Sequence, residues 1–92
     1  MASSSDLTRT VTIVNELGLH ARPAAKIAQI ARSAAATVWV IRGPEQVDAS
    51  SIIELLTLAC EKGTTLTFTA ADPADRHILD ALVQLVESGF EE

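Results

Sequence analysis

The sequence predicts an α+β fold: a two-layer open-faced sandwich in which a four-stranded antiparallel sheet is covered on one face by three helices. The first observation is size. A chain of 92 residues that is 48% hydrophobic suffices for one small domain with a modest core. The second is order, because strand-like and helix-like patterns follow one another as β-α-β-β-α-β-α. The third is the segment "TLTFTA", whose apolar residues alternate with threonines, as in a strand with one face in water.

The beginning of the chain supplies one strand and one helix. Residues 1–9 are expected to be a flexible N-terminal leader, followed by a single domain over residues 10–92. Residues 10–15 have the composition of a strand. Residues 21–35 have helical spacing, and the apolar positions of one face are Ala24, Ile27, Ala28 and Ala31.

A hairpin and a second helix are predicted next. Residues 37–42 favour a β-branched strand, and a Gly-Pro pair then breaks the chain before "EQVD", a short possible partner strand. Ser51 and Glu54 match a capping box, in which each side chain satisfies a backbone N–H group that the helix leaves unpaired. Gly63 is the expected residue just beyond this helix, with Lys62 in its last turn.

The last two elements are a strand at 65–70 and a third helix. Asp72 is the expected N-cap and Pro73 the first helical residue. Gly89 marks the expected end. The buried stripe consists of Ile78, Leu82, Leu85 and Val86.

Composition narrows the classes of function. A net charge of −5 argues against nucleic acid as the main partner. The N-terminus lacks the apolar core of a secretory signal, and no apolar run approaches the roughly 20 residues that span a membrane. The single cysteine, Cys60, cannot form an internal disulfide, which fits a reducing cytosol. We therefore expect a soluble, cytoplasmic monomer that does not insert into membranes.

Positive charge is concentrated in one part of this acidic chain. Residues 17–44 contain no acidic side chain and four basic ones, which are Arg22, Lys26, Arg32 and Arg42. The pattern is either chance clustering on solvated faces or a locally positive site for an anion.

His20 stands immediately before the predicted first helix. First-turn N–H groups have no partner within a helix, and Pro23 fits there because proline lacks that group. These donors and the helix dipole favour an anion, and Arg22 adds a guanidinium fork suited to phosphate. A neutral imidazole nitrogen can attack phosphorus and leave the phosphoryl group within reach of these donors. From the residues alone, a weak cap or a loop residue is the commoner role for such a histidine.

The segment "GLHARPA", followed by an alanine-rich helix, resembles the phosphorylation-site motif of the HPr family. These proteins are the histidine-containing phosphocarriers of the bacterial phosphoenolpyruvate:sugar phosphotransferase system. A second segment, "VDASSIIELLTLACEKGTTLTFTA", resembles the family's second helix and fourth strand, and the likeness extends from about Val11 to Phe90. It implies that His20 accepts a phosphoryl group on Nδ1 from phosphorylated enzyme I and passes it to an enzyme IIA. Arg22 would steady that group, and Pro23 would shape the turn.

The predicted second helix is more apolar than one core-facing stripe requires. It is either simply well buried or exposes part of the surplus as a docking patch. The resemblance favours docking, with Leu55 and Leu58 turned inward. The docking residues that it implies beside His20 are Ile52, Ile53, Leu56 and Pro23.

The resemblance also implies a regulatory phosphorylation site at Ser51. This residue matches the serine that a dedicated kinase phosphorylates, and a phosphorylase dephosphorylates, in some family members. A plain helix cap explains the same serine. Ser50 and Glu54 depart from the family pattern, which often has lysine before the serine and glycine or lysine in place of the glutamate.

Two readings of function remain beside the sugar-branch phosphocarrier. One is a nitrogen-branch phosphocarrier that acts on a regulatory acceptor, and the other is an allosteric binding module for regulators.

No cofactor is implied. Two distant histidines without paired ligands give no metal site, and His77 is expected to be a surface residue. The expected role is a carrier with a phosphohistidine intermediate rather than a true turnover enzyme.

Overall fold

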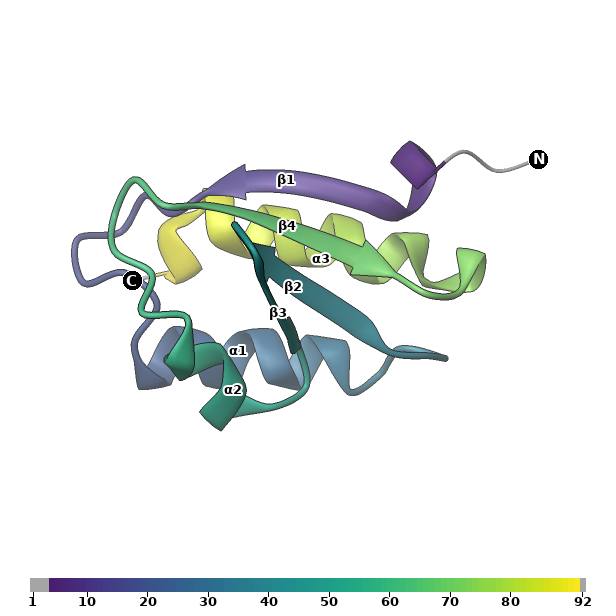
Figure 1. The fold of residues 1–92 in the computed structure, drawn as a ribbon, viewed down its shortest axis with the longest axis horizontal. Coiled ribbons are helices and arrows are strands. Elements are labelled where there is room, and N and C mark those ends of the chain that lie inside the picture. Colours follow the sequence, from purple (N-terminus) through teal and green to yellow (C-terminus); the bar gives the residue numbers. More distant parts are fainter. Residues whose placement is uncertain (1–3, 92) are drawn as a thin grey trace.

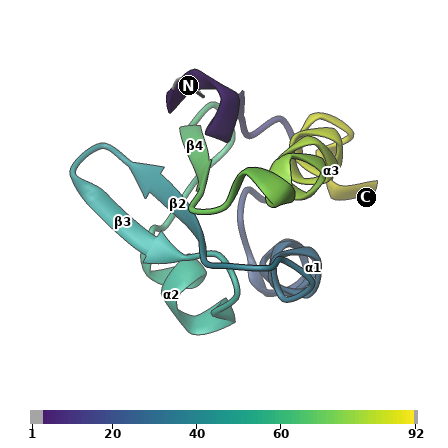
Figure 2. The same ribbon diagram turned by 90° about the vertical axis from the view of Figure 1, so that its right-hand side faces the viewer.

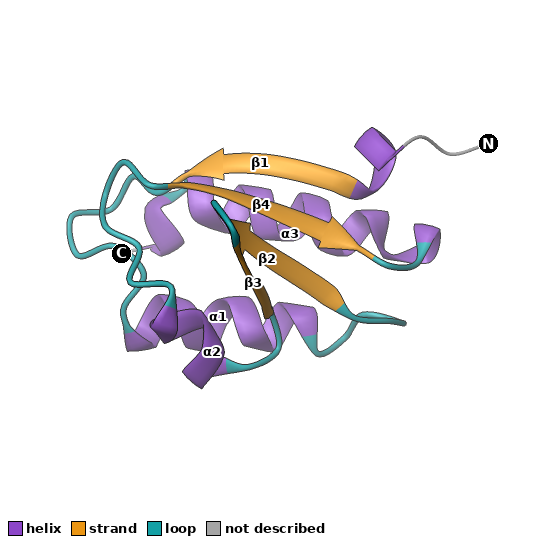
Figure 3. Ribbon diagram, viewed as in Figure 1, coloured by secondary structure: helices purple, strands orange, loops and turns teal. Residues whose placement is uncertain are grey.

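The computed structural model describes residues 4–91 and contains a four-stranded antiparallel sheet with α-helices on one face (Figures 1 and 3). The sheet and helix order confirm the predicted open-faced sandwich. The strands are β1 (Thr8–Thr12), β2 (Val38–Arg42), β3 (Glu45–Asp48) and β4 (Thr65–Ala70). The helices are α1 (Ala21–Ala31), α2 (Ile52–Thr57) and α3 (Arg76–Glu87), with short 3-10 helices at Ser4–Leu7, Pro73–Asp75 and Gly89–Glu91.

The sheet has the strand order β1-β4-β2-β3. Phe68 of the inner strand β4 lies opposite Arg9 of β1 and Val40 of β2. As the alternation predicts, the apolar residues of β4 are buried and its threonines face outward. The predicted hairpin is confirmed, since β2 pairs with β3 across a turn in which Gly43 has φ +57°.

The helices cover the apolar face of the sheet, and Figure 2 shows α1 and α3 on the same side. Both predicted stripes are buried, and each fully buried large aliphatic side chain contributes about 1.5–3 kcal/mol to folding. The small residues of the α1 stripe allow close packing. Among the described residues, no helix is long and apolar enough to cross a membrane.

The first strand begins earlier than predicted. Thr8 and Arg9 pair with β4, and the Arg9 guanidinium also donates to Asp80 of α3 at 3.2 Å. The leader boundary at residue 9 is therefore too late, because these two residues belong to β1. Ser4–Leu7 forms a single 3-10 turn, and residues 1–3 of the predicted leader lie outside the described part of the chain.

Helix α1 ends at Ala31, four residues before the predicted end. The reason lies far away in sequence, at the buried side chain of Asp75. Its carboxylate accepts the backbone N–H groups of Ala35 at 2.8 Å and Ala36 at 3.0 Å. These donors are thereby bonded outside the helix, and the chain turns toward β2.

Helix α2 is also shorter than predicted. It ends at Thr57, and Ala59, with φ +51°, takes the left-handed position expected of Gly63. Arg42 donates to the carbonyl oxygen of Leu58 at 2.8 Å, so a cation sits at the negative end of this helix. Lys62 lies beyond the helix, contrary to the prediction.

Candidate functional site

His20 is the N-cap residue of α1, as the sequence predicts. Its backbone is extended, with φ −95° and ψ −170°, and its carbonyl accepts the N–H group of Ala24 at 3.0 Å. The side chain makes no capping hydrogen bond to the helix and is partly exposed. The imidazole therefore belongs to the residue at the start of α1, and Figure 1 shows that this helix begins on the left of the view.

The first turn of α1 retains its positive end. Within residues 4–91, the backbone N–H groups of Ala21 and Arg22 have no hydrogen-bond partner, and Pro23 has no such group. The turn contains no acidic residue. The Arg22 side chain is exposed and has neither a hydrogen bond nor an ion pair within the described chain. This helix start can therefore receive an anion beside His20.

The four basic residues of this region do not form one anion site. Lys26 donates to the carbonyl oxygen of Phe90, and Arg42 caps α2. Arg32 is the C-cap of α1, about 16 Å along the helix axis from its start. Of these four basic residues, Arg22 is the one that lies in the first turn of α1, two residues after His20, with an exposed side chain.

The loop that carries His20 is fastened to the segment that follows α2. The N–H group of Leu19 donates to the carbonyl oxygen of Cys60 at 2.9 Å. Gly18 has φ +67°, and an added Cβ atom would collide with that same oxygen. Glycine is therefore required on two grounds, conformation and space. Because Cys60 lies three residues beyond α2, this contact holds the helix and the histidine loop together.

The predicted docking residues differ in exposure. Ile53 is 78% exposed and Leu56 is 39% exposed, so both offer apolar surface. Ile52 is only partly exposed and packs against the core. Pro23 is buried, so its part in the site is to shape the first turn of α1 rather than to offer surface. Leu55 and Leu58 are completely buried, which confirms the prediction that both side chains point inward.

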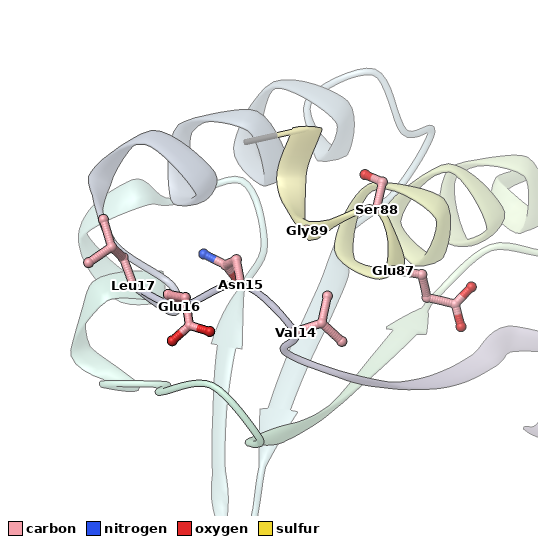
Figure 4. A pocket seen from close by; sticks show the side chains of 7 residues that line it. All are labelled: Val14, Asn15, Glu16, Leu17, Glu87, Ser88 and Gly89. Atoms are coloured by element: carbon pink, nitrogen blue, oxygen red, sulfur yellow. The ribbon is translucent and has the colours of Figure 1, made fainter.

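Two exposed apolar side chains in the loop before His20 are not among the predicted docking residues. Leu17 is 75% exposed and Val14 is 46% exposed. Both line an open pocket of about 610 Å³ between this loop and the end of α3, shown in Figure 4. A signal was present, since Leu17 is a large apolar residue in a predicted connector. Val14 falls within the strand predicted over residues 10–15, but β1 ends at Thr12 and leaves it in the loop.

Ser51 caps α2, as predicted. Its Oγ accepts the N–H group of Glu54 at 3.2 Å. The second half of the capping box is absent, because Glu54 Oε1 lies 3.5 Å from the N–H group of Asp48 and the Ser51 N–H group donates to the Asp48 carbonyl oxygen. The cap accounts for a serine here, and the kinase site stays a prediction.

We find no activated nucleophile among the titratable residues Cys60, Glu16 and His77. Burial raises the pKa of the Cys60 thiol, which disfavours its thiolate. The Lys62 ammonium lowers the pKa of the Glu16 carboxyl group by hydrogen bonding and charge, and both side chains are exposed. His77 is exposed, as predicted. Within residues 4–91, no three His, Cys, Asp or Glu side chains are grouped so as to hold a metal ion.

Comparisons with known proteins point to one family. Residues 7–88 match the family model described as PTS HPr component phosphorylation site. Phosphocarrier protein HPr of Cupriavidus necator is 41% identical over 86 residues, covering 94% of this chain and 97% of that protein. Phosphocarrier protein NPr of Shewanella violacea is 38% identical over 86 residues, covering 94% of each chain.

Solved structures agree with the sequence comparisons. HPr-C-His from Thermoanaerobacter tengcongensis has a TM-score of 0.83 and 36% identity, covering 92% of this chain and 96% of that one. A structure described as an HPr dimer from the same organism has a TM-score of 0.68 and 33% identity over the whole of both chains. That dimer concerns the relative, and the predicted monomeric state of this chain stays a prediction.

Proposed function

The chain belongs to the HPr family of phosphocarriers of the phosphotransferase system, and we propose that His20 accepts a phosphoryl group from phosphorylated enzyme I and passes it to an enzyme IIA. The single observation that carries this proposal is the open start of α1. There the partly exposed His20 is the N-cap residue of a helix whose first N–H groups are uncapped, and Arg22 lies in the first turn with an exposed side chain.

The transfer step follows from that arrangement. An imidazole nitrogen, Nδ1 by resemblance to the family, uses its lone pair to form a bond to phosphorus, while the bond to the enzyme I donor breaks and its electron pair stays with the donor. The N–H groups of Ala21 and Arg22 and the Arg22 guanidinium then stabilise the phosphoryl oxygens. The return step to the acceptor is the same displacement with His20 as leaving group, so these donors serve both directions.

Partner docking is assigned to the exposed apolar surface at the same end of the molecule. Ile53 and Leu56 on α2, with Leu17 on the histidine loop, form what we call the apolar patch. Exposed apolar groups with few charges are typical of protein interaction sites. The contact of Leu19 with Cys60 supports a fixed position of His20 relative to this patch, so that a partner seated on the patch finds the imidazole in place.

We also propose that Ser51, the cap of α2, is a regulatory phosphorylation site. A phosphate there would carry about −1.5 to −2 charges next to the apolar patch, and a docking partner would have to desolvate it. Phosphorylation by a Ser51 kinase would thus weaken docking by electrostatics while the positive start of α2 tolerates the charge.

The nitrogen-branch reading is a second candidate function. It is supported by relatives named NPr that match at 38% identity, close to the 41% of the relatives named HPr. The two readings share His20 and enzyme I-type donors and differ in the acceptor. Transfer rates to a sugar-specific and to a nitrogen-regulatory enzyme IIA, measured side by side, distinguish them.

The test of the shared step is direct. The chain is incubated with enzyme I and phosphoenolpyruvate, and its intact mass is recorded before and after mild acid. We expect the chain to gain the mass of one phosphoryl group and to lose it again in mild acid. The same mass should also be lost when an enzyme IIA is supplied in place of acid. Binding of enzyme I without phosphate uptake would contradict the proposal and favour an allosteric binding module.

A further inference from the structure

We propose that Asn15 is a positioning residue for phosphoryl transfer, because its side chain holds the carbonyl group to which the backbone of His20 is bonded. The inference rests on the proposed function, since it takes His20 as the phosphoryl acceptor. It adds a residue that lies five positions before the histidine and outside the motif that carries the resemblance.

Asn15 and His20 donate hydrogen bonds to the same acceptor. The amide Nδ2 of Asn15 donates to the carbonyl oxygen of Gly18 at 2.8 Å. The same oxygen accepts the backbone N–H group of His20 at 3.1 Å. Asn15 is only 9% exposed, so its bond is shielded from water. Figure 4 shows the amide nitrogen of Asn15 on the side of Leu17, toward the later residues of the loop. A single oxygen atom thus links the Asn15 side chain to the main chain of His20.

Main-chain contacts hold the rest of the loop independently of that amide. The N–H group of Gly18 donates to the carbonyl oxygen of Asn15 at 3.2 Å, and Leu19 is bonded to Cys60. Neither contact involves the Asn15 side chain. Removal of the amide should therefore leave the loop attached to the domain while releasing the Gly18 carbonyl, which sets the direction in which the chain enters α1.

A shift of the His20 backbone would change how the imidazole is aligned with the phosphoryl donor. Displacement at phosphorus requires the attacking nitrogen, the phosphorus and the leaving group to lie nearly in line, and a misplacement of about 1 Å can cost up to about 100-fold in rate. The part of the apolar patch that lies on α2, Ile53 and Leu56, does not depend on the Asn15 amide. The loss should thus appear in kcat, with KM for the chain as substrate of enzyme I changed little.

The experiment compares Asn15→Asp and Asn15→Ala with the parent chain. Asn15→Asp keeps the size of the side chain but replaces the donor with an acceptor that repels the Gly18 carbonyl. Asn15→Ala removes the whole amide group, and with it the donor, without adding an acceptor. Glu87→Gln is the matched control, because Glu87 lines the same pocket from the end of α3 and has no part in holding the loop. Each variant is assayed for kcat and KM with enzyme I and phosphoenolpyruvate, for melting temperature, and for the amide and imidazole NMR signals of His20.

We expect both Asn15 variants to lose about tenfold in kcat with KM within about twofold, and to show displaced His20 signals, while Glu87→Gln behaves as the parent. Unchanged kcat in a folded Asn15 variant, or melting below the assay temperature in both, would overturn the inference and assign Asn15 to the loop's stability alone. If the parent chain takes up no phosphate, the proposed function fails. The His20 signals then decide this inference, because unshifted signals in Asn15→Ala would overturn it.

Discussion

The starts of α1 and α2 show how one chain treats two helix N-termini in opposite ways. At α2, the hydroxyl of Ser51 accepts a first-turn N–H group and Glu54 places a carboxylate in the same turn. At α1, the N-cap residue His20 makes no capping bond, and the first turn has no acidic side chain. The second helix therefore satisfies its positive end internally, whereas the first leaves it available to an external anion.

Under the proposed function, the difference lies in what each helix start does: α2 gains the stability of a cap, and α1 lacks it at the residue proposed to accept the phosphoryl group. A side-chain cap typically contributes about 0.5–2 kcal/mol, and α1 forgoes it at the residue that carries the reactive imidazole. A phosphoryl group on that imidazole would supply the missing anion. The predictions below alter one helix start at a time, beginning with the largest expected effect.

The most severe change is His20→Ala. It removes the acceptor while leaving α1 in place, so acid-labile phosphate uptake from enzyme I should be abolished. His77→Ala, on the exposed part of α3, should take up phosphate at the parent rate. Intact mass after incubation with phosphoenolpyruvate measures both, and equal labelling of the two variants would refute the assignment.

Next in size is Arg22→Ala. A charge-assisted hydrogen bond is worth about 1.5–3 kcal/mol, which corresponds to a fall in transfer rate of about 10- to 150-fold. Because Arg22 is exposed and has no partner within the described chain, the melting temperature should change little. Arg32→Ala, at the other end of the same helix, is the control. A large drop in melting temperature with normal transfer would reverse the interpretation.

A smaller effect is expected from Ile53→Glu on α2. The side chain is 78% exposed, so a charge there should be tolerated by the fold but should weaken docking. We expect a raised KM with enzyme I, a nearly unchanged kcat and a native circular dichroism spectrum. Collapse of the fold would show that Ile53 belongs to the core and that the apolar patch is wrongly assigned.

The smallest effects concern Ser51. Ser51→Ala should lower the free energy of unfolding by about 1 kcal/mol through loss of the cap, without a change in transfer rate. Ser51→Asp keeps a capping oxygen and adds part of the charge of a phosphate, so its stability should be near that of the parent. Its KM with enzyme I should be raised, and the difference should shrink at high salt. Unchanged kinetics in Ser51→Asp would leave Ser51 as a cap only.

The parts of this molecule that the sequence predicts are those determined by local pattern. The buried stripes of α1 and α3, the alternation in β4 and the cap at Ser51 each depend on a few neighbouring residues. Asp72 also acts as a cap, but of the 3-10 turn Pro73–Asp75, and α3 begins at Arg76 rather than at the predicted Pro73. The position of His20 at a helix start follows in the same way from Pro23 and the apolar spacing beyond it.

What local pattern could not show depends on distant contacts. Helix α1 ends early because Asp75, some 40 residues away, binds Ala35 and Ala36. Helix α2 ends early at Thr57, and the left-handed backbone of Ala59 then turns the chain toward the contact between Cys60 and Leu19. Distant contacts also explain why the four basic residues of segment 17–44 do not form one site. Lys26 and Arg42 donate to the carbonyl oxygens of Phe90 and Leu58, which lie elsewhere in the chain.

The central claim is that the phosphoryl group on His20 occupies the open start of α1, and backbone amide NMR of the chain before and after phosphorylation by enzyme I tests it most directly. We expect the largest shifts at the amides of Ala21 and Arg22, which would hold the phosphoryl oxygens, and small shifts at Ile52 and Ile53 in the capped start of α2. Unshifted Ala21 and Arg22 amides in a fully phosphorylated chain, or phosphate located at another residue, would contradict the account.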